Sequence, residues 1–218
     1  FHGRTLATLK ATGQTSFHKD DFAPYPKGFM FCEDVKSVYQ AIDDRTAAVM
    51  IELIQGEGGV EPLDKQEVQE LAQYLQEKGI LLIVDEIQTV VYRSGEFLAS
   101  KAYGIAPDII TLAKGLAGGV PIGAMLTTHK DIFEVGDHGS TFGGNYLSTR
   151  AGLEVLNILK NYKNSGKMNE MFVYFDEQLK AFFQKHSKYF EKVVGLGLMR
   201  GIRCKKDVDV GSMITSGF

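Results

Sequence analysis

The stretch "DIITLAKGLAGGVPIGA" (residues 108–124) carries an apolar run to a single lysine and follows it with glycines. The run at 108–114 has the length and composition of a strand that is covered on both faces. Lys114 therefore stands where a buried strand emerges, next to backbone with few side chains. An ordinary lysine in a turn fits this pattern, and so does a lysine that does covalent chemistry.

Segments with strand and helix patterns alternate on either side of this stretch. Apolar runs at 46–53, 80–86 and 122–128 predict further strands. Apolar residues at helical spacing predict helices at 34–43 and at 64–79, the second ending at a glycine. Because the connections are short, this order predicts an α/β fold with a mostly parallel sheet.

The pattern changes near residue 150. Two long helical stretches lie between 147 and 190, and a strand with a glycine kink is expected at 193–203. We therefore expect a large sheet domain over 1–150, then a connecting helix and the start of a smaller C-terminal α+β domain over 151–218. Both ends of the sequence are abrupt, which predicts truncation at both ends.

Composition narrows the class of protein. The chain has 218 residues, 44% of them hydrophobic, and a net charge of -3, which argues against a nucleic-acid partner. No apolar run approaches the roughly 18 residues of a membrane-spanning helix. Two distant cysteines, Cys32 and Cys204, predict a reducing, cytoplasmic setting. The histidines show no spacing typical of a metal site.

The ends of the predicted strands gather ionisable residues. In open α/β sheets, ligands bind beyond the carboxyl ends of the strands. One strand ends in Asp85 and Glu86, and the next ends in Lys114. Glu52 and Glu57 follow the first strand. We therefore expect carboxylates and a lysine at one edge of the sheet.

Asp85 and Lys114 allow two interpretations each. Asp85 caps a following helix, or it is a buried anion that holds a proton on a ligand nitrogen. A lysine that forms an imine with an aldehyde, together with an aspartate for a pyridinium nitrogen, is the minimal set for pyridoxal phosphate. The glycines after Lys114 fit neither GxxxxGK[ST] nor GxGxxG.

Two further segments have both ordinary and functional interpretations. "GDHGSTFGGN" (136–145) is a polar loop, or an anion site that uses the Ser140 and Thr141 hydroxyls. In "FHGRT" (1–5), Phe1 belongs to the core or stacks on a flat ring. Arg4 is a surface charge or a clamp for a carboxylate.

Six segments together carry a resemblance to a known family. "FHGRT", "IELIQGEGG", "LLIVDEIQT", "RSGEFLA", "PDIITLAKGLAGGVPIGA" and "HGSTFGGN", in this order, resemble the class III aminotransferases, in particular their acetylornithine/ornithine group. The resemblance runs from residue 1 to about 203. It implies a fold type I aminotransferase-like large domain, pyridoxal 5'-phosphate as cofactor, and a homodimer with shared active sites.

The resemblance also implies the residues that hold the cofactor. Lys114 would form the imine with pyridoxal phosphate and carry the proton, and Asp85 would hold the pyridine N–H. Gln88 would bond the ring hydroxyl, while Ile87 and Phe1 would pack on the two ring faces. The implied cofactor-binding set is Phe1, Asp85, Glu86, Ile87, Gln88, Lys114 and Thr141, with Thr141 reaching the phosphate of the neighbouring subunit.

On the substrate side, the resemblance implies roles for three residues. Arg4 would bind a substrate carboxylate, Ser140 would lie beside the substrate, and Glu57 would pair with an arginine nearer the C-terminus. The implied reaction moves the terminal amine of N-acetylornithine to 2-oxoglutarate, in arginine biosynthesis. The alternatives are another ω-amine donor (ornithine, succinylornithine or 4-aminobutyrate) or an inactive truncated fragment.

Two positions depart from the family pattern. Val90 stands where the family usually has glycine, and Tyr146 where it usually has proline. Because valine rarely adopts a positive φ, the loop at 89–92 is expected to be shifted or disordered.

Overall fold

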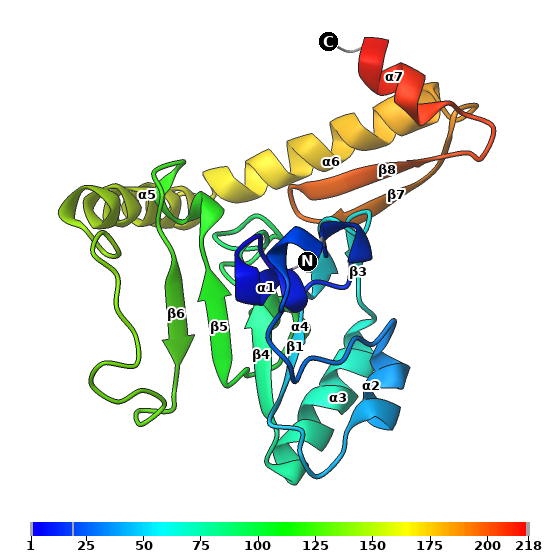
Figure 1. Ribbon diagram of the computed structural model, residues 1–218. Helices are drawn as coiled ribbons and strands as arrows, with labels where there is room; N and C mark the ends of the chain where they lie inside the picture. Colours follow the sequence, from blue (N-terminus) through cyan, green and yellow to red (C-terminus); the bar gives the residue numbers. More distant parts are fainter. Residues whose placement is uncertain (1, 19, 217–218) are drawn as a thin grey trace.

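The computed structural model describes residues 2–18 and 20–216, and a four-stranded sheet lies at its centre (Figure 1). The strand order is β1 (Ala48–Ile51), β4 (Leu81–Asp85), β5 (Ile109–Leu112) and β6 (Ala124–Thr127). β1, β4 and β5 are parallel, and β6 runs antiparallel to β5 at the edge. The prediction of a mostly parallel sheet is confirmed.

Two of the predicted helices, α2 (Val35–Ala41) and α3 (Lys65–Lys78), begin at aspartate caps. Asp34 accepts a hydrogen bond from the Ser37 amide at 2.7 Å, and Asp64 accepts one from the Glu67 amide at 3.0 Å. Such caps satisfy amides that have no partner in the first turn. Gly79 ends α3 in the left-handed conformation (φ 69°). Local sequence signals therefore set these boundaries.

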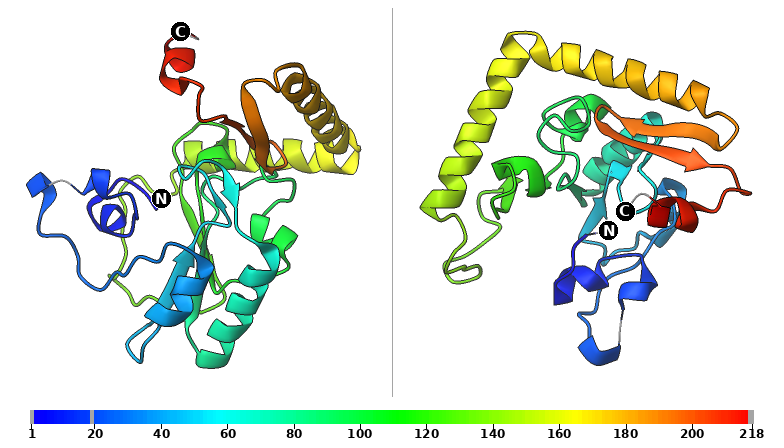
Figure 2. Two further views of the ribbon diagram at one scale, coloured as in Figure 1. Left: turned by 90° about the vertical axis from the view of Figure 1, so that its right-hand side faces the viewer. Right: turned by 90° about the horizontal axis from the view of Figure 1, so that it is seen from above.

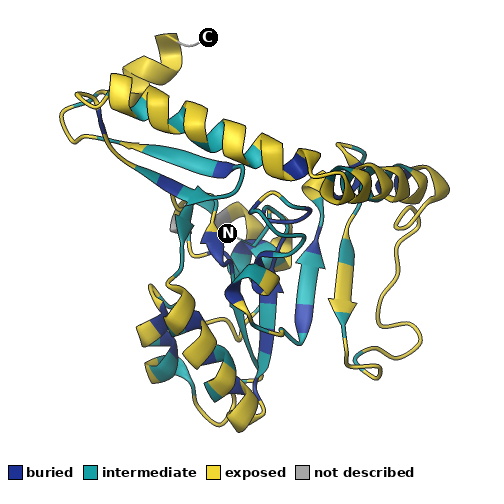
Figure 3. Cartoon of the chain, turned by 180° about the vertical axis from the view of Figure 1, so that it is seen from behind, coloured by how far each residue is buried: buried dark blue, intermediate teal, exposed yellow. Residues whose placement is uncertain are grey.

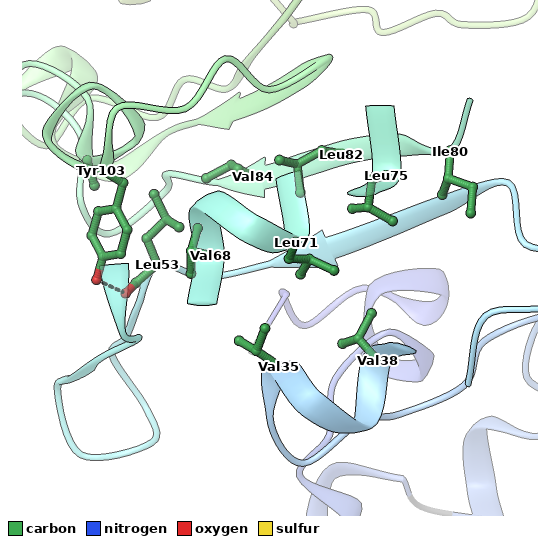
Figure 4. Packing of buried hydrophobic residues seen from close by; sticks show 11 residues of the cluster. Val35, Val38, Leu53, Val68, Leu71, Leu75, Ile80, Leu82, Val84 and Tyr103 are labelled. Atoms are coloured by element: carbon green, nitrogen blue, oxygen red, sulfur yellow. Dashed lines mark hydrogen bonds between the residues drawn. The ribbon is translucent and has the colours of Figure 1, made fainter. Parts of the chain in front are cut away.

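The main core lies between these two helices and β4 (Figure 4). α3 presents Val68, Leu71 and Leu75 on one buried face, at helical spacing. Across from them lie Leu82 and Val84 of the strand. Further members of the cluster are Val35, Val38, Leu53, Ile80, Ala99 and Tyr103.

The long helices α5 (Tyr146–Asn164) and α6 (Lys167–Lys185) follow the sheet and bend sharply at Gly166, as the view from above shows (Figure 2). Most of their surface is exposed (Figure 3). α5 packs on the 3-10 turn η3 (Lys114–Ala117): a Cβ at Gly152 would lie 3.4 Å from the Leu116 carbonyl oxygen. A second domain starting near residue 151 stays a prediction.

The single strand predicted at 193–203 is wrong. The chain forms an antiparallel hairpin, β7 (Phe190–Leu196) and β8 (Met199–Cys204), joined by Gly197 and Leu198. Gly197 has φ 58°, and two-residue hairpin loops favour glycine for this conformation. What was interpreted as a glycine kink is therefore a turn that reverses the chain.

The remaining elements are short. They are α1 (Leu6–Lys10), η1 (Thr15–Phe17), η2 (Asp20–Phe22), β2 (Ile54–Gln55), β3 (Glu61–Pro62), α4 (Ala99–Tyr103) and α7 (Val210–Ser216). β2 and β3 pair antiparallel as a small hairpin. None of the helices within residues 2–18 and 20–216 combines the length and apolar character that crossing a bilayer requires.

The conflict expected at Val90 does not arise. Val90 is buried, its amide donates to the Glu86 carbonyl at 2.9 Å, and its φ is not positive. The left-handed conformation falls on Tyr92 instead (φ 64°). Tyr146 is the first residue of α5, where the amide has no partner within the helix, so both tyrosine and proline fit there.

The α3 core gives a test of the fold. Replacing Leu71 with alanine should lower the free energy of unfolding by about 2–5 kcal/mol, because the side chain is fully buried and its removal leaves a cavity. Urea denaturation measures this change. The half-exposed Val173 of α6 is the control: Val173→Ala should change stability by less than about 0.5 kcal/mol. Equal effects of the two variants would contradict this core.

Candidate active site

The register of two parallel strands brings Asp85 and Lys114 to the same edge of the sheet. Asp85 stands opposite Thr111, and the Glu86 amide donates to the Thr111 carbonyl at 3.0 Å. Lys114 follows three residues after Thr111, at the start of η3. Both chemical groups therefore emerge at the carboxyl ends of neighbouring strands, as the sequence predicts.

A cavity of about 320 Å³ opens at this edge. Four separate segments contribute to it: the N-terminal segment, the turn after β1, the end of β4 and the start of η3. Its lining residues are Gly3, Arg4, Glu52, Glu57, Asp85, Ile87, Gln88 and Lys114. Six predicted site residues are thus brought together: Arg4, Glu57, Asp85, Ile87, Gln88 and Lys114.

Asp85 is held rigidly at the wall of this cavity. Its side chain is buried, and the residue is 4% exposed. Oδ1 accepts from the Ile87 amide (3.1 Å) and the Thr111 hydroxyl (3.3 Å), and Oδ2 bonds His2 Nδ1 at 2.9 Å. These three partners fix the plane of the carboxylate, so it can bind one particular atom of a ligand.

Sequence reasoning missed His2. It belongs to "FHGRT", yet only folding brings it to Asp85, 83 positions further along the chain. The His2 amide donates to the Thr12 hydroxyl at 3.1 Å, which anchors the segment. The only signal in the sequence was the position of His2 beside Arg4.

Lys114 is exposed and has φ 44°. Positive φ is uncommon for a residue with a side chain, and such outliers concentrate at functional sites. Two contacts hold the η3 turn in place. Leu116 and Ala117 are buried, and the Leu116 amide donates to the Ala113 carbonyl at 3.0 Å. The fold thus imposes a demanding backbone conformation on the lysine.

Polar side chains complete the rest of the lining. The Arg4 guanidinium carbon lies 5.2 Å from the centroid of the Phe17 ring, a stacking distance for a cation. Gln88 packs so closely on Gly56 that a Cβ there would overlap its amide oxygen, so a larger residue at 56 would displace the Gln88 side chain. Glu52 is a buried carboxylate in the same lining.

The structure places three predicted residues elsewhere. Glu86 is fully buried and accepts hydrogen bonds from the Thr89 hydroxyl and from the Ala99 (2.8 Å) and Ser100 (2.7 Å) amides at the start of α4. Ser140 and Thr141 lie on an exposed loop outside the cavity. Phe1 lies outside the described residues.

The arrangement fits a flat, cationic heteroaromatic ligand that carries an aldehyde. The fixed carboxylate of Asp85 can bind a protonated ring nitrogen, and the amine of Lys114 can react with the aldehyde. The apolar side chain of Ile87 can pack on the face of the ring. Among residues 2–18 and 20–216, no group of three or more metal-ligating side chains gathers. Fold and site together define an α/β protein with a ligand site at the carboxyl edge of its sheet.

Comparison with known proteins identifies the family. The model of the class-III aminotransferases matches residues 1–217, so the chain belongs to this family. An acetylornithine aminotransferase from Wolinella succinogenes is 55% identical over 218 residues, all of this chain and 55% of that protein. One from Aquifex aeolicus is 44% identical over 211 residues, 95% of this chain and 54% of that protein.

Solved structures agree with the fold type I architecture. The ornithine aminotransferase from Toxoplasma gondii superposes with a TM-score of 0.86 at 30% identity, covering 98% of this chain and 52% of its own. An N-acetylornithine aminotransferase from Stenotrophomonas maltophilia gives 0.66 at 31% identity, with 80% and 46% covered. The chain spans about half the length of these relatives.

The buried Glu86 allows a test of how the segment after β4 is held in place. Glu86→Gln places an NH2 group against hydrogen-bond donors, so the free energy of unfolding should fall by about 1–3 kcal/mol. Urea denaturation measures the loss, with the exposed Glu177→Gln as control. Unchanged stability in Glu86→Gln would contradict a structural role for this carboxylate.

Proposed function

We propose that this chain forms the cofactor and substrate site of a pyridoxal-phosphate-dependent aminotransferase that moves the terminal amine of N-acetylornithine to 2-oxoglutarate. The observation that carries this proposal is the shared cavity of Asp85 and Lys114. The names of the relatives from Wolinella succinogenes and Aquifex aeolicus support the donor.

Asp85 is the residue that would hold the ring nitrogen. When bound, pyridoxal phosphate supplies an aldehyde and a ring that withdraws electrons from the carbon that loses a proton. An ionised Asp85 keeps a proton on the ring nitrogen, because a nearby anion favours the cationic form. His2, Thr111 and the Ile87 amide keep the carboxylate aimed.

Lys114 is the residue that would bind the cofactor aldehyde and move the proton. Its amine is a nucleophile when deprotonated, and it would serve as the base that takes a proton from the substrate's terminal carbon. Gln88 and Ile87 line the same cavity and would contact the ring hydroxyl and the ring face.

Arg4 is the residue that would hold the far end of the donor. The α-amine of N-acetylornithine is acylated, so the reacting amine is the terminal one and the α-carboxylate lies at the other end. The planar guanidinium of Arg4 suits that carboxylate. Its place in the cavity lining supports this role.

A homodimer with shared sites is part of the proposal. Ser140 and Thr141 lie outside the cavity, which supports their use by a second copy. Beside them, Phe142 and Tyr146 are 80% and 95% exposed, as expected of a surface that another chain covers. The free thiols of Cys32 and Cys204 support the proposed cytoplasmic location.

Ornithine is the second candidate donor. The superposition on the ornithine aminotransferase from Toxoplasma gondii favours it, because that structure shares most of this chain's fold. Succinylornithine and 4-aminobutyrate belong to the same proposed class of ω-amines. An inactive fragment is the remaining alternative, which the length of about half a relative supports.

Lys114→Ala tests the cofactor chemistry. The wild type, incubated with pyridoxal phosphate and reduced with borohydride, should retain the cofactor on the peptide that contains Lys114. Lys114→Ala should lose both this label and turnover, because no other lysine lines the cavity among the described residues. Lys101→Ala, at an exposed position of α4, should keep both. A wild type that takes up no cofactor would support the fragment alternative.

Arg4→Ala tests the donor. The KM for N-acetylornithine should rise by roughly 10- to 100-fold, since a charged hydrogen bond contributes about 1.5–3 kcal/mol. Rates with ornithine and 4-aminobutyrate, measured in parallel, rank the donors, and Arg45→Ala on the surface is the control. If the wild type turns over N-acetylornithine no faster than 4-aminobutyrate, the proposed donor is wrong.

A further inference from the structure

The hairpin β2–β3 carries Glu57 at its tip, and its base is fixed. Ile54 pairs with Pro62, and the Tyr103 hydroxyl donates to the carbonyls of Leu53 (3.0 Å) and Leu63 (2.7 Å) on either side. Burial raises the pKa of Tyr103 to about 12, so this hydroxyl stays a donor. The base is therefore tied firmly to α4.

The residues at the tip of the β2–β3 hairpin do little to fix its conformation. Glu57 is flanked by Gly56 on one side and by Gly58 and Gly59 on the other. Glycines leave the backbone many conformations, so contacts from outside the loop must hold the backbone at Glu57. One such contact is the Gln14 side-chain amide, which donates to the Glu57 carbonyl at 3.2 Å.

Val60 is the first residue after Glu57 with a side chain, and its conformation is unusual. Its φ is 58°, which is an outlier for a β-branched residue and costs about 1–3 kcal/mol. Its amide closes the loop by donating to the Gln55 carbonyl at 2.9 Å. Such a conformation persists only where surrounding contacts impose it.

Those contacts come from a notch in the C-terminal hairpin, which lies against β3 (Figure 1). The notch lies at Gly195 on β7. A Cβ at Gly195 would lie 2.9 Å from Val60 Cγ1, so the valine side chain packs where a side chain at Gly195 would stand. Gly201 on β8 lies further from Val60, and the two residues line a cavity of about 320 Å³.

Charged groups align the same two hairpins. Glu61, next to Val60, forms ion pairs with Arg203 of β8 and with Lys192 of β7, the latter at 3.6 Å. These side chains are partly exposed, so the pairs contribute little energy. The apolar contact of Val60 lies closer to Glu57 along the chain than these ion pairs do.

We propose that Val60 is a positioning residue: by packing into the notch at Gly195, it sets where Glu57 lies in the cavity that Arg4 also lines, and thereby how strongly the amine donor binds. This inference rests on the proposed aminotransferase function. It assigns the hairpin β7–β8, more than 130 positions along the chain from Glu57, a part in recognising the donor.

Val60→Ala tests this inference, with Val38→Ala as matched control in the α2–α3 core. Val60→Ala should raise the KM for the amine donor about tenfold and leave kcat within about twofold, because it removes uniform binding. The visible spectrum of the bound cofactor should not change. Val38→Ala should lower stability without changing the KM.

Hydrogen exchange separates this inference from the proposed function. Amides at 56–60 should exchange faster in Val60→Ala than in wild type, and at the wild-type rate in Val38→Ala. Unchanged exchange in Val60→Ala overturns the inference, and so does an unchanged donor KM in an active enzyme. A wild type that accepts no amine donor overturns the proposed function, and faster exchange would still support the anchoring.

Discussion

The parallel pairing of β4 with β5 is the constraint on which the site depends. Asp85 stands opposite Thr111, and this register presents its carboxylate to the cavity beside Lys114. Side chains alternate between the two faces of a strand, so a shift of one residue would exchange Asp85 with Glu86. The anion would then point towards α4 instead of the cavity.

The neighbouring acids Asp85 and Glu86 show how one strand end serves two purposes. Asp85 keeps one side open to the cavity, whereas every hydrogen bond of the Glu86 side chain goes to Thr89 and the start of α4. Glu86 thereby holds the segment after β4 in place. The active-site carboxylate and the structural one are adjacent because the pleat of the strand sends them in opposite directions.

Two small hairpins outside the central sheet, β2–β3 and β7–β8, also contribute to the site. β2–β3 carries Glu57 to the cavity, and β7–β8 supports it through Val60 and Glu61. In the site proposed here, chemistry at Asp85 and Lys114 rests on the rigid sheet. Donor recognition rests on loops whose position depends on later parts of the chain.

Local signals in the sequence, periodicity and caps, are enough to predict the strands β1, β4, β5 and β6 and the helices α2 and α3. They also predict that Asp85 and Lys114 stand at strand ends. The hairpin β7–β8 was mistaken for one strand, since a glycine turn and a glycine kink look alike in sequence. The contact of His2 with Asp85, the buried role of Glu86 and the packing of Val60 emerge only in the folded chain. Each of these depends on contacts between residues far apart in the chain, which no local pattern records.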